Sequence, residues 1–106
     1  MFDFKVSNLH IEGHRTVANQ FVIEREDGIY FQSHQTVIAI KSKASGNIYV
    51  DPDWHTHSQS TTKYTAIFLS QAHGLRYSPT TIKMFQAGKR HNPLIKFMKL
   101  NGGRHE

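Results

Sequence analysis

The first half of the chain alternates apolar and polar positions in short runs, which is typical of strands that bury one face. Weak alternation over residues 2–6 and a Phe-Val-Ile run within residues 17–26 predict two strands, because β-branched and aromatic side chains favour extended backbone. Asp27-Gly28 then predicts a tight two-residue turn, since glycine tolerates the positive φ angles of such turns. Ile29-Tyr30-Phe31 resumes the apolar run, and the pattern therefore predicts a β-hairpin.

Two further runs extend this pattern. Residues 36–41 are almost uninterrupted in apolar content, which predicts a central strand that is buried on both faces. Ser45-Gly46-Asn47 predicts the next turn, and Ile48-Tyr49-Val50 predicts a short strand that Asp51-Pro52-Asp53 ends. Together these segments predict an antiparallel meander.

After Trp54 the period of the apolar residues changes from two to about 3.6, as in a helix. The residues that share one helical face are Tyr64, Ile67, Phe68 and Ala72. Ser58, Ser60 or Thr61 can cap the start of this helix, and Gly74 is expected to end it.

A second helix is predicted between Ser78-Pro79 and Gly88, because serine caps a helix and proline suits its first position. The short apolar segment 94–100 follows Pro93 and predicts a further strand. The order of elements therefore predicts an α+β fold, in which a small antiparallel meander sheet packs against two short helices, with a C-terminal strand as an addition.

A chain of 106 residues that is 38% apolar suits one domain, which we place at residues 1–100, followed by a flexible C-terminal tail at 101–106. No run approaches the roughly 18 to 20 apolar residues of a membrane-spanning helix, and the start lacks the pattern of a signal peptide. The absence of cysteine removes disulfides, thiolate nucleophiles and Cys-based zinc sites. We therefore expect a cytoplasmic protein with no membrane partner.

The net charge of +5 is concentrated in the last third of the chain, where Glu106 is the one acidic residue after residue 69. Such a surface attracts nucleic acid, acidic protein patches or anionic ligands, and a merely solubilising face is an equal alternative. Basic and aromatic residues interleave there, so that cations can follow a phosphate track and Tyr77 can stack on a base. The candidate nucleic-acid contacts are Arg76, Lys83, Lys89, Arg90, Lys96 and Lys99.

Candidate chemistry is sparse. Asp51, Asp53, His55 and His57 alternate, and an extended backbone would place them on one side, where carboxylate and imidazole are ligands for a divalent ion. Turn formation and helix capping explain the same residues, so the metal candidates Asp53, His55 and His57 are weak. Hydrolase elbows, phosphate loops and dinucleotide fingerprints do not occur in the sequence, and we expect no enzyme and no cofactor. The predicted helix start near Lys63 can bind an anion, or its hydroxyl residues simply cap it.

Several short motifs follow one another between residues 18 and 69. They are Ala18-Asn19, Phe21, Tyr30-Phe31-Gln32-Ser33, Thr36-Val37-Ile38-Ala39, Ile48-Tyr49-Val50-Asp51, Trp54, Ser60-Thr61-Thr62-Lys63-Tyr64 and Phe68-Leu69. In this order they resemble a family of small uncharacterised proteins of bacteriophages and their bacterial hosts, with the pattern YFQSY…TxIA…vYLD…WDYSxTTxKyxxxFL. Two positions depart from it: His34 replaces an aromatic residue, and His-Thr-His-Ser at 55–58 replaces an acidic-aromatic-Ser run. The resemblance implies a shared fold and a phage or mobile-element setting, and it implies no activity.

Small size, missing catalytic motifs and this resemblance favour a non-enzymatic binding module. On these three grounds together we expect a host protein or ribonucleoprotein complex as the partner, with inhibition of a host defence such as a CRISPR effector as a candidate role. Candidate contact residues are Tyr30, His34, Trp54, His55 and Tyr77, because aromatic anchors are typical of interfaces, although Trp54 suits a core position equally well. The alternatives are a basic nucleic-acid-binding protein and, third, a metal-dependent hydrolase.

Overall fold

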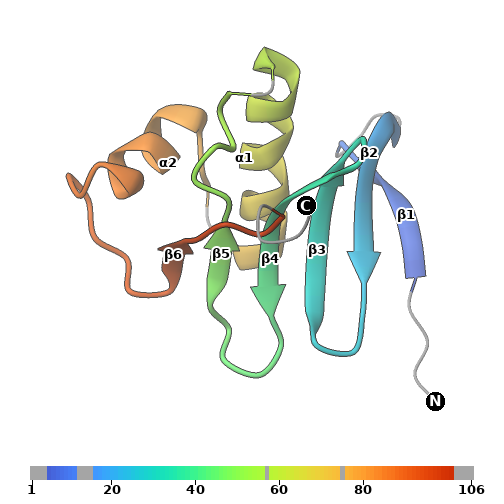
Figure 1. Cartoon of the computed structure of the whole chain (residues 1–106), viewed down its shortest axis with the longest axis horizontal. Coiled ribbons are helices and arrows are strands. Elements are labelled where there is room, and N and C mark those ends of the chain that lie inside the picture. The colour runs from blue at the N-terminus through green and yellow to red at the C-terminus, as the bar shows by residue number, and fades with distance from the viewer. Residues whose placement is uncertain (1–4, 12–15, 57, 75, 102–106) are drawn as a thin grey trace.

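The computed structural model describes residues 5–11, 16–56, 58–74 and 76–101, which form an α+β fold (Figure 1). One sheet contains six strands in chain order: β1 (Lys5–His10), β2 (Thr16–Glu24), β3 (Gly28–Ser33), β4 (Thr36–Ser42), β5 (Ile48–Val50) and β6 (Ile95–Phe97). Two helices, α1 (Gln59–His73) and α2 (Pro79–Gln86), lie between β5 and β6 in the chain. The predicted meander with two helices and a C-terminal strand is therefore confirmed.

The last strand differs from the others in how it pairs with its neighbour. Strands β1 to β5 pair antiparallel, whereas β6 runs parallel to β5, with Ile48 opposite Ile95 and Val50 opposite Phe97. A hairpin cannot connect parallel neighbours, so both helices belong to the crossover between β5 and β6. In Figure 1, α1 lies behind the sheet and α2 lies beside it, next to β6.

The core lies between α1 and the sheet face that α1 covers. Phe31 of β3 is opposite Ala39 of β4, and its ring stacks on Phe68 of α1 with 5.4 Å between ring centroids. Ile38 and Ala39 are consecutive and yet both fully buried, because the register of β4 shifts at this point. This bulge accommodates the nearly continuous apolar run of β4, which is central as predicted, whereas Ile40 on the other face is half-buried.

The helix ends follow local sequence rules. Ser58 caps α1, and its Oγ accepts a hydrogen bond from the Thr61 backbone N–H at 3.0 Å. Gly74 ends α1 in the left-handed region at φ 75°, as the sequence predicts. Lys41 adds a tertiary contact, because its Nζ donates to the Ala72 carbonyl at 2.6 Å, near the negative end of the helix dipole. The N-terminal boundary of α1 is thus set by the Ser58 side chain, and the C-terminal boundary by the backbone conformation of Gly74.

The predicted two-residue turn at Asp27-Gly28 is wrong. Strand β2 ends at Glu24, and Gly28 is already the first residue of β3, where it lies opposite Ser42 of β4 and its carbonyl accepts a hydrogen bond from the Arg25 N–H at 2.8 Å. A Cβ at Gly28 would lie 2.4 Å from the Lys41 carbonyl oxygen. Glycine is needed there because β4 approaches closely, rather than because the turn needs a positive φ.

The C-terminal segment after β6 crosses the open face of the sheet (Figure 1). Asn101, which the sequence places in a flexible tail, instead binds both backbone groups of Val37, with Oδ1 accepting at 2.9 Å and Nδ2 donating at 2.7 Å. Asp51 also accepts a hydrogen bond from the Leu100 backbone N–H at 3.2 Å. Asn101 therefore packs with the domain, and the remaining residues of the predicted tail, 102–106, lie outside the described residues.

Candidate functional site

The second half of the chain carries positive charge without compensating carboxylates. The sequence contains no Asp or Glu between Asp53 and Glu106, and it contains eight Lys or Arg residues in that interval. Helices α1 and α2 and strand β6 all fall inside it. The asymmetry noted from the sequence after residue 69 therefore begins earlier, at the end of β5, and coincides with the crossover unit.

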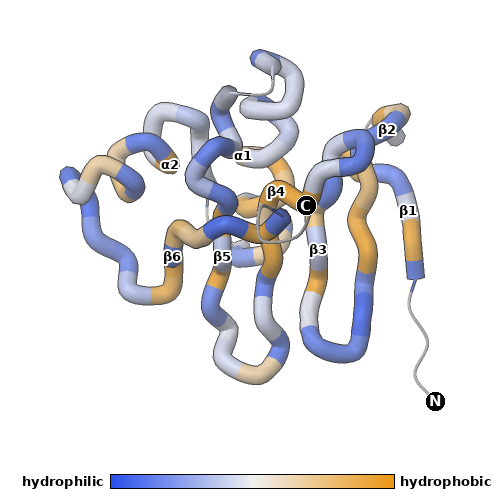
Figure 2. The backbone as a smooth tube through the Cα atoms, in the orientation of Figure 1, coloured by the Kyte–Doolittle hydropathy of each residue, from blue (hydrophilic) through white to orange (hydrophobic). Residues whose placement is uncertain are grey.

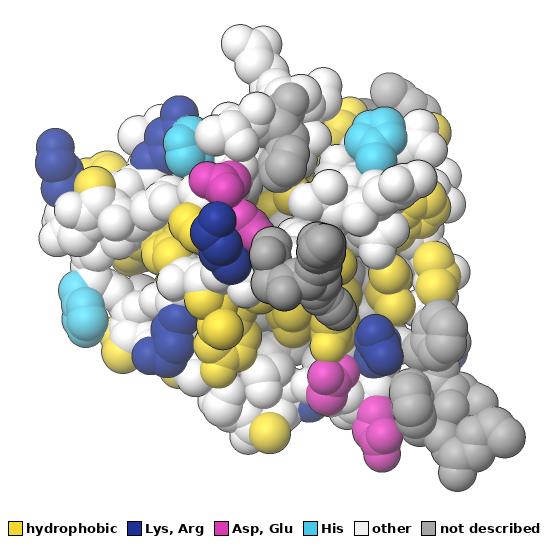
Figure 3. All heavy atoms as spheres, in the orientation of Figure 1, with side chains coloured by type: hydrophobic (Ala, Val, Ile, Leu, Met, Phe, Trp, Pro, Cys, Tyr) yellow, Lys and Arg dark blue, Asp and Glu magenta, His cyan; other side chains and the backbone are white. Residues whose placement is uncertain are grey.

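All six predicted nucleic-acid contacts are exposed: Arg76, Lys83, Lys89, Arg90, Lys96 and Lys99. The ion pair found among the described residues joins Lys43 to Glu24 at 3.4 Å, outside this set. Figure 3 shows Lys and Arg side chains spread over the half of the molecule that holds α2 and β6. We call these six residues the basic surface. Their charges face solvent, where they can bind anions.

Part of the basic surface forms a pocket beside α2. Arg76 from the α1–α2 connection, Thr81 from the first turn of α2, and Arg90, His91 and Asn92 from the segment after α2 surround a hollow of about 330 Å³. The residues that line this space thus include two arginines, a histidine, a threonine and an asparagine. Arginine presents a planar fork of donors that matches the oxygens of a phosphate or carboxylate. The pocket is therefore suited to an anion.

Aromatic residues hold the pocket in shape. The Arg90 guanidinium lies 5.3 Å from the centroid of the Phe85 ring, a cation–π geometry, and Phe85 meets the edge of Tyr77 at 6.1 Å. The Tyr77 hydroxyl binds Nδ1 of His73, and its backbone N–H donates to Ser70 Oγ at 2.9 Å. Burial raises the pKa of Tyr77, against smaller lowering effects of the Arg90 charge and of a hydrogen bond with Asn92. The Tyr77 side chain therefore stays uncharged and forms a fixed part of the pocket lining.

The structure changes the interpretation of the predicted partner contacts. Tyr77 is 8% exposed and Trp54 is fully buried, so neither aromatic ring is available as a surface anchor or for base stacking. Trp54 takes the core position that the sequence left open, and its indole Nε1 donates to Gln86 Oε1 of α2 at 2.8 Å. The prediction of an exposed Tyr77 is wrong, because its ring stacks on His73 of α1 and meets Phe85 of α2.

The other predicted contacts come from different elements. His34 is exposed in the β3–β4 turn at φ 55°, and His55 is exposed in the β5–α1 connection, edge-on to the Trp54 ring at 5.5 Å. Tyr30 is half-buried in β3, and its hydroxyl donates to Asp27 Oδ2 at 2.7 Å. Burial and this neighbouring carboxylate raise the pKa of Tyr30. The structure therefore does not gather the five predicted contacts at one pocket.

The metal-site hypothesis assumes that residues 51–57 are extended, and the structure contradicts this for the described residues 52–56. Residues 52–56 form consecutive turns rather than an extended strand, with the Trp54 N–H bonded to the Asp51 carbonyl at 3.0 Å. The Asp51 carboxylate accepts hydrogen bonds from the Asp53 N–H and from the C-terminal segment, which gives it a structural role. Within the described ranges, no three His, Asp or Glu side chains are placed to hold a metal, and His57 lies outside those ranges.

At the start of α1, the other candidate anion site, the Ser58 side chain caps the helix. Ser58 Oγ accepts from the Thr61 N–H, and the Thr62 hydroxyl donates to the Ser58 carbonyl at 2.9 Å. Capping therefore explains these hydroxyl residues without a ligand, and Lys63 is simply an exposed residue of this first turn.

A second surface, which sequence reasoning missed, lies on the sheet face opposite α1. Successive cross-strand partners form a row on this face: Val6, Ile23, Tyr30, Ile40, Tyr49 and Lys96. Figure 2 shows the apolar segments that run side by side in the strands of this sheet. We call these six residues the cross-strand row. The period-two pattern of each strand contains its members, but only the strand registers reveal that they align.

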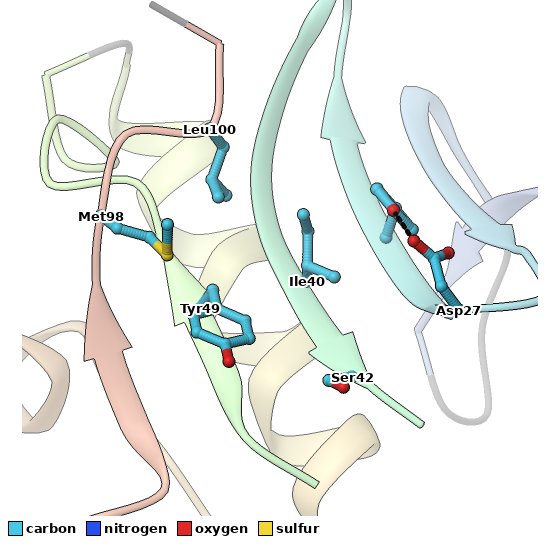
Figure 4. Close-up of a pocket in the computed structure, with 7 residues that line it drawn as sticks. Asp27, Ile40, Ser42, Tyr49, Met98 and Leu100 are labelled. Carbon is cyan, nitrogen blue, oxygen red and sulfur yellow. Dashed lines mark hydrogen bonds between the residues drawn. The ribbon is translucent and has the colours of Figure 1, made fainter. Parts of the chain in front are cut away.

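The cross-strand row continues into a hollow. Tyr30, Ile40 and Tyr49 line a space of about 340 Å³, with Met98 and Leu100 on its other side (Figure 4). The two C-terminal residues lie across from the strands because the segment after β6 returns over the open face. This hollow is mainly apolar, in contrast to the pocket beside α2.

Comparisons of the chain with protein-family models, curated proteins and solved structures find no match. The resemblance to phage proteins therefore stays a prediction that rests on the quoted motifs. Within the described part of the chain, neither helix has the length and apolar character that crossing a membrane requires.

Proposed function

We propose that this protein is a nucleic-acid-binding protein that contacts phosphates through the basic surface. The observation that carries the proposal is the exposure of all six predicted cations in a stretch of chain without carboxylates. Of the five aromatic and histidine contacts proposed for a protein partner, two are buried. The surface chemistry therefore favours the phosphate backbone over a protein that needs those anchors.

Binding by such a surface is dominated by counterion release. Each neutralised phosphate of a single strand contributes roughly −0.7 to the slope of log K against log salt concentration. If all six cations contact phosphates, the slope is roughly −4, and affinity falls roughly 300-fold between 50 and 200 mM salt. Because Tyr77, the aromatic residue predicted to stack on a base, is buried, we expect weak dependence on base sequence.

The test is fluorescence anisotropy with labelled single-stranded and double-stranded DNA and RNA over a series of salt concentrations. Lys83→Ala and Lys96→Ala each remove one phosphate contact, and we expect each to reduce the slope by roughly 0.7. Lys43→Ala is the matched control, because it removes the same charge outside the basic surface. Binding that is insensitive to salt, or an equal effect of Lys43→Ala, would contradict the proposal.

The cross-strand row favours a second function, the docking of a partner protein. Apolar residues aligned on an open sheet face are typical of interaction surfaces, because the strand residues that face solvent are normally polar. The adjoining hollow of about 340 Å³ suits one large apolar side chain, and Lys96 at the end of the row favours a carboxylate beside it. The partner of this second function is a protein with an apolar anchor next to acidic residues, in the host setting that the resemblance implies.

This second function is tested by photo-crosslinking. A photoreactive residue at position 49 should crosslink a bacterial protein that wild-type protein also captures. Tyr49→Asp should abolish that capture, whereas Lys83→Ala, which alters the basic surface alone, should retain it. Capture of the same protein by Tyr49→Asp would exclude the sheet face as its docking surface.

A further inference from the structure

The pocket beside α2 differs in shape from the rest of the basic surface. The other cations are single exposed side chains, whereas Arg76, Arg90 and His91 border one hollow of about 330 Å³. A concave site with several hydrogen-bond donors favours ligands whose shape lets them enter it over ligands that contact only its rim. The pocket can therefore do more than add general positive charge.

We propose that this pocket binds the terminal phosphate of a nucleic-acid strand, an inference that rests on the proposed nucleic-acid binding. A phosphodiester inside a strand carries one negative charge and is flanked by sugars on both sides. A terminal phosphomonoester carries about −1.5 to −2 charges at pH 7, has three free oxygens and is attached on one side. It can enter the hollow end-on and meet both guanidinium groups at once.

The charges of the pocket are available to such a ligand. Its lining contains no carboxylate among the described residues, and the nearest acidic residues in the sequence are Asp53 and Glu106. The Thr81 backbone N–H is bonded to Ser78 Oγ at 3.2 Å, so the helix start itself is capped. Recognition thus depends on the side chains of Arg76, Arg90 and His91.

The pocket is also preorganised. The Phe85 ring packs against the Arg90 guanidinium. The Lys89 N–H donates a hydrogen bond to the Met84 carbonyl at 2.9 Å, where the chain leaves α2. Asn92 fixes the other end of the loop, because its Oδ1 accepts from the Leu94 N–H at 3.0 Å and its carbonyl accepts from the Ile95 N–H, the first residue of β6. Little ordering of the loop is needed when a phosphate binds.

The experiment compares one oligonucleotide sequence with a 5′-phosphate, with a 3′-phosphate and with hydroxyl groups at both ends. We expect wild-type protein to bind one phosphorylated form about tenfold more tightly than the hydroxyl form, as charge-assisted hydrogen bonds imply. Arg90→Ala and Arg76→Ala should remove this preference. Lys96→Ala, the matched control, should weaken all three oligonucleotides equally and keep the preference.

The outcomes separate this inference from the proposed function. Salt-sensitive binding with equal affinity for all three oligonucleotides overturns the terminal-phosphate inference and leaves the proposed function standing. Failure of every oligonucleotide to bind overturns both. A preference that persists in Arg76→Ala and Arg90→Ala overturns the location of the site. Thermal unfolding of each variant verifies that these exposed substitutions leave the fold intact.

Discussion

Replacing Trp54 with phenylalanine tests how the core positions α2 and hence the pocket. The Trp54 indole N–H donates to Gln86 Oε1, while Gln86 Nε2 donates to the Pro52 carbonyl at 2.9 Å. Phenylalanine leaves Oε1 without its donor, which costs about 1–3 kcal/mol, and the smaller ring leaves unfilled volume that costs about 1 kcal/mol more. We expect the free energy of unfolding to fall by about 2–4 kcal/mol.

Urea denaturation followed by far-UV circular dichroism measures this loss, because Trp54 is the single tryptophan and its fluorescence disappears in the variant. Gln86→Leu and the double variant complete a mutant cycle. The hydrogen bond predicts a coupling energy of about 1 kcal/mol or more between the two positions. Additive losses, or a Trp54→Phe loss below about 0.5 kcal/mol, would refute the view that this contact anchors α2.

Three other predictions follow from single contacts. Gly28→Ala should destabilise the fold by about 1–3 kcal/mol in urea melts, because the added Cβ meets the Lys41 carbonyl, a backbone atom that cannot rotate away. His34→Gly should raise the melting temperature, since φ 55° strains a residue with a Cβ by about 1 kcal/mol; an unchanged or lower value would contradict this. The raised pKa values of Tyr30 and Tyr77 mean that the folded protein retains protons longer than the unfolded chain, so stability should fall as pH rises through about 10. Phenylalanine at both positions should flatten that fall.

Features set by neighbouring residues could be predicted from the sequence. The cap at Ser58 and the stop at Gly74 follow from local hydrogen bonding and backbone freedom, and the structure has both. The parallel pairing of β6 could not be predicted, because it depends on where the crossover returns the chain. The role of Gly28 is not evident from its neighbours in the sequence for a related reason: its constraint comes from β4, which is distant in sequence.

The candidate site shows the same limit. Exposure of the six cations follows from side-chain chemistry, because Lys and Arg are rarely buried. Whether Trp54 and Tyr77 point inward depends on what covers them, and composition does not specify that. Arg76 and Arg90 are separated by the whole of α2, so the pocket that they share becomes visible only when that helix is placed.

Because β6 and Asn101 lie near the end of the described chain, the sheet can be completed only late in synthesis. Residues 95–101 emerge from the ribosome after every strand and helix that they touch, and the contact between Val37 and Asn101 spans 64 positions. Until they arrive, one edge of β5 has no partner, and the Asp51 carboxylate lacks the two donors that this segment supplies. A nascent chain stalled before residue 95 should therefore be a target for chaperones and proteases, whereas seven further residues complete the sheet.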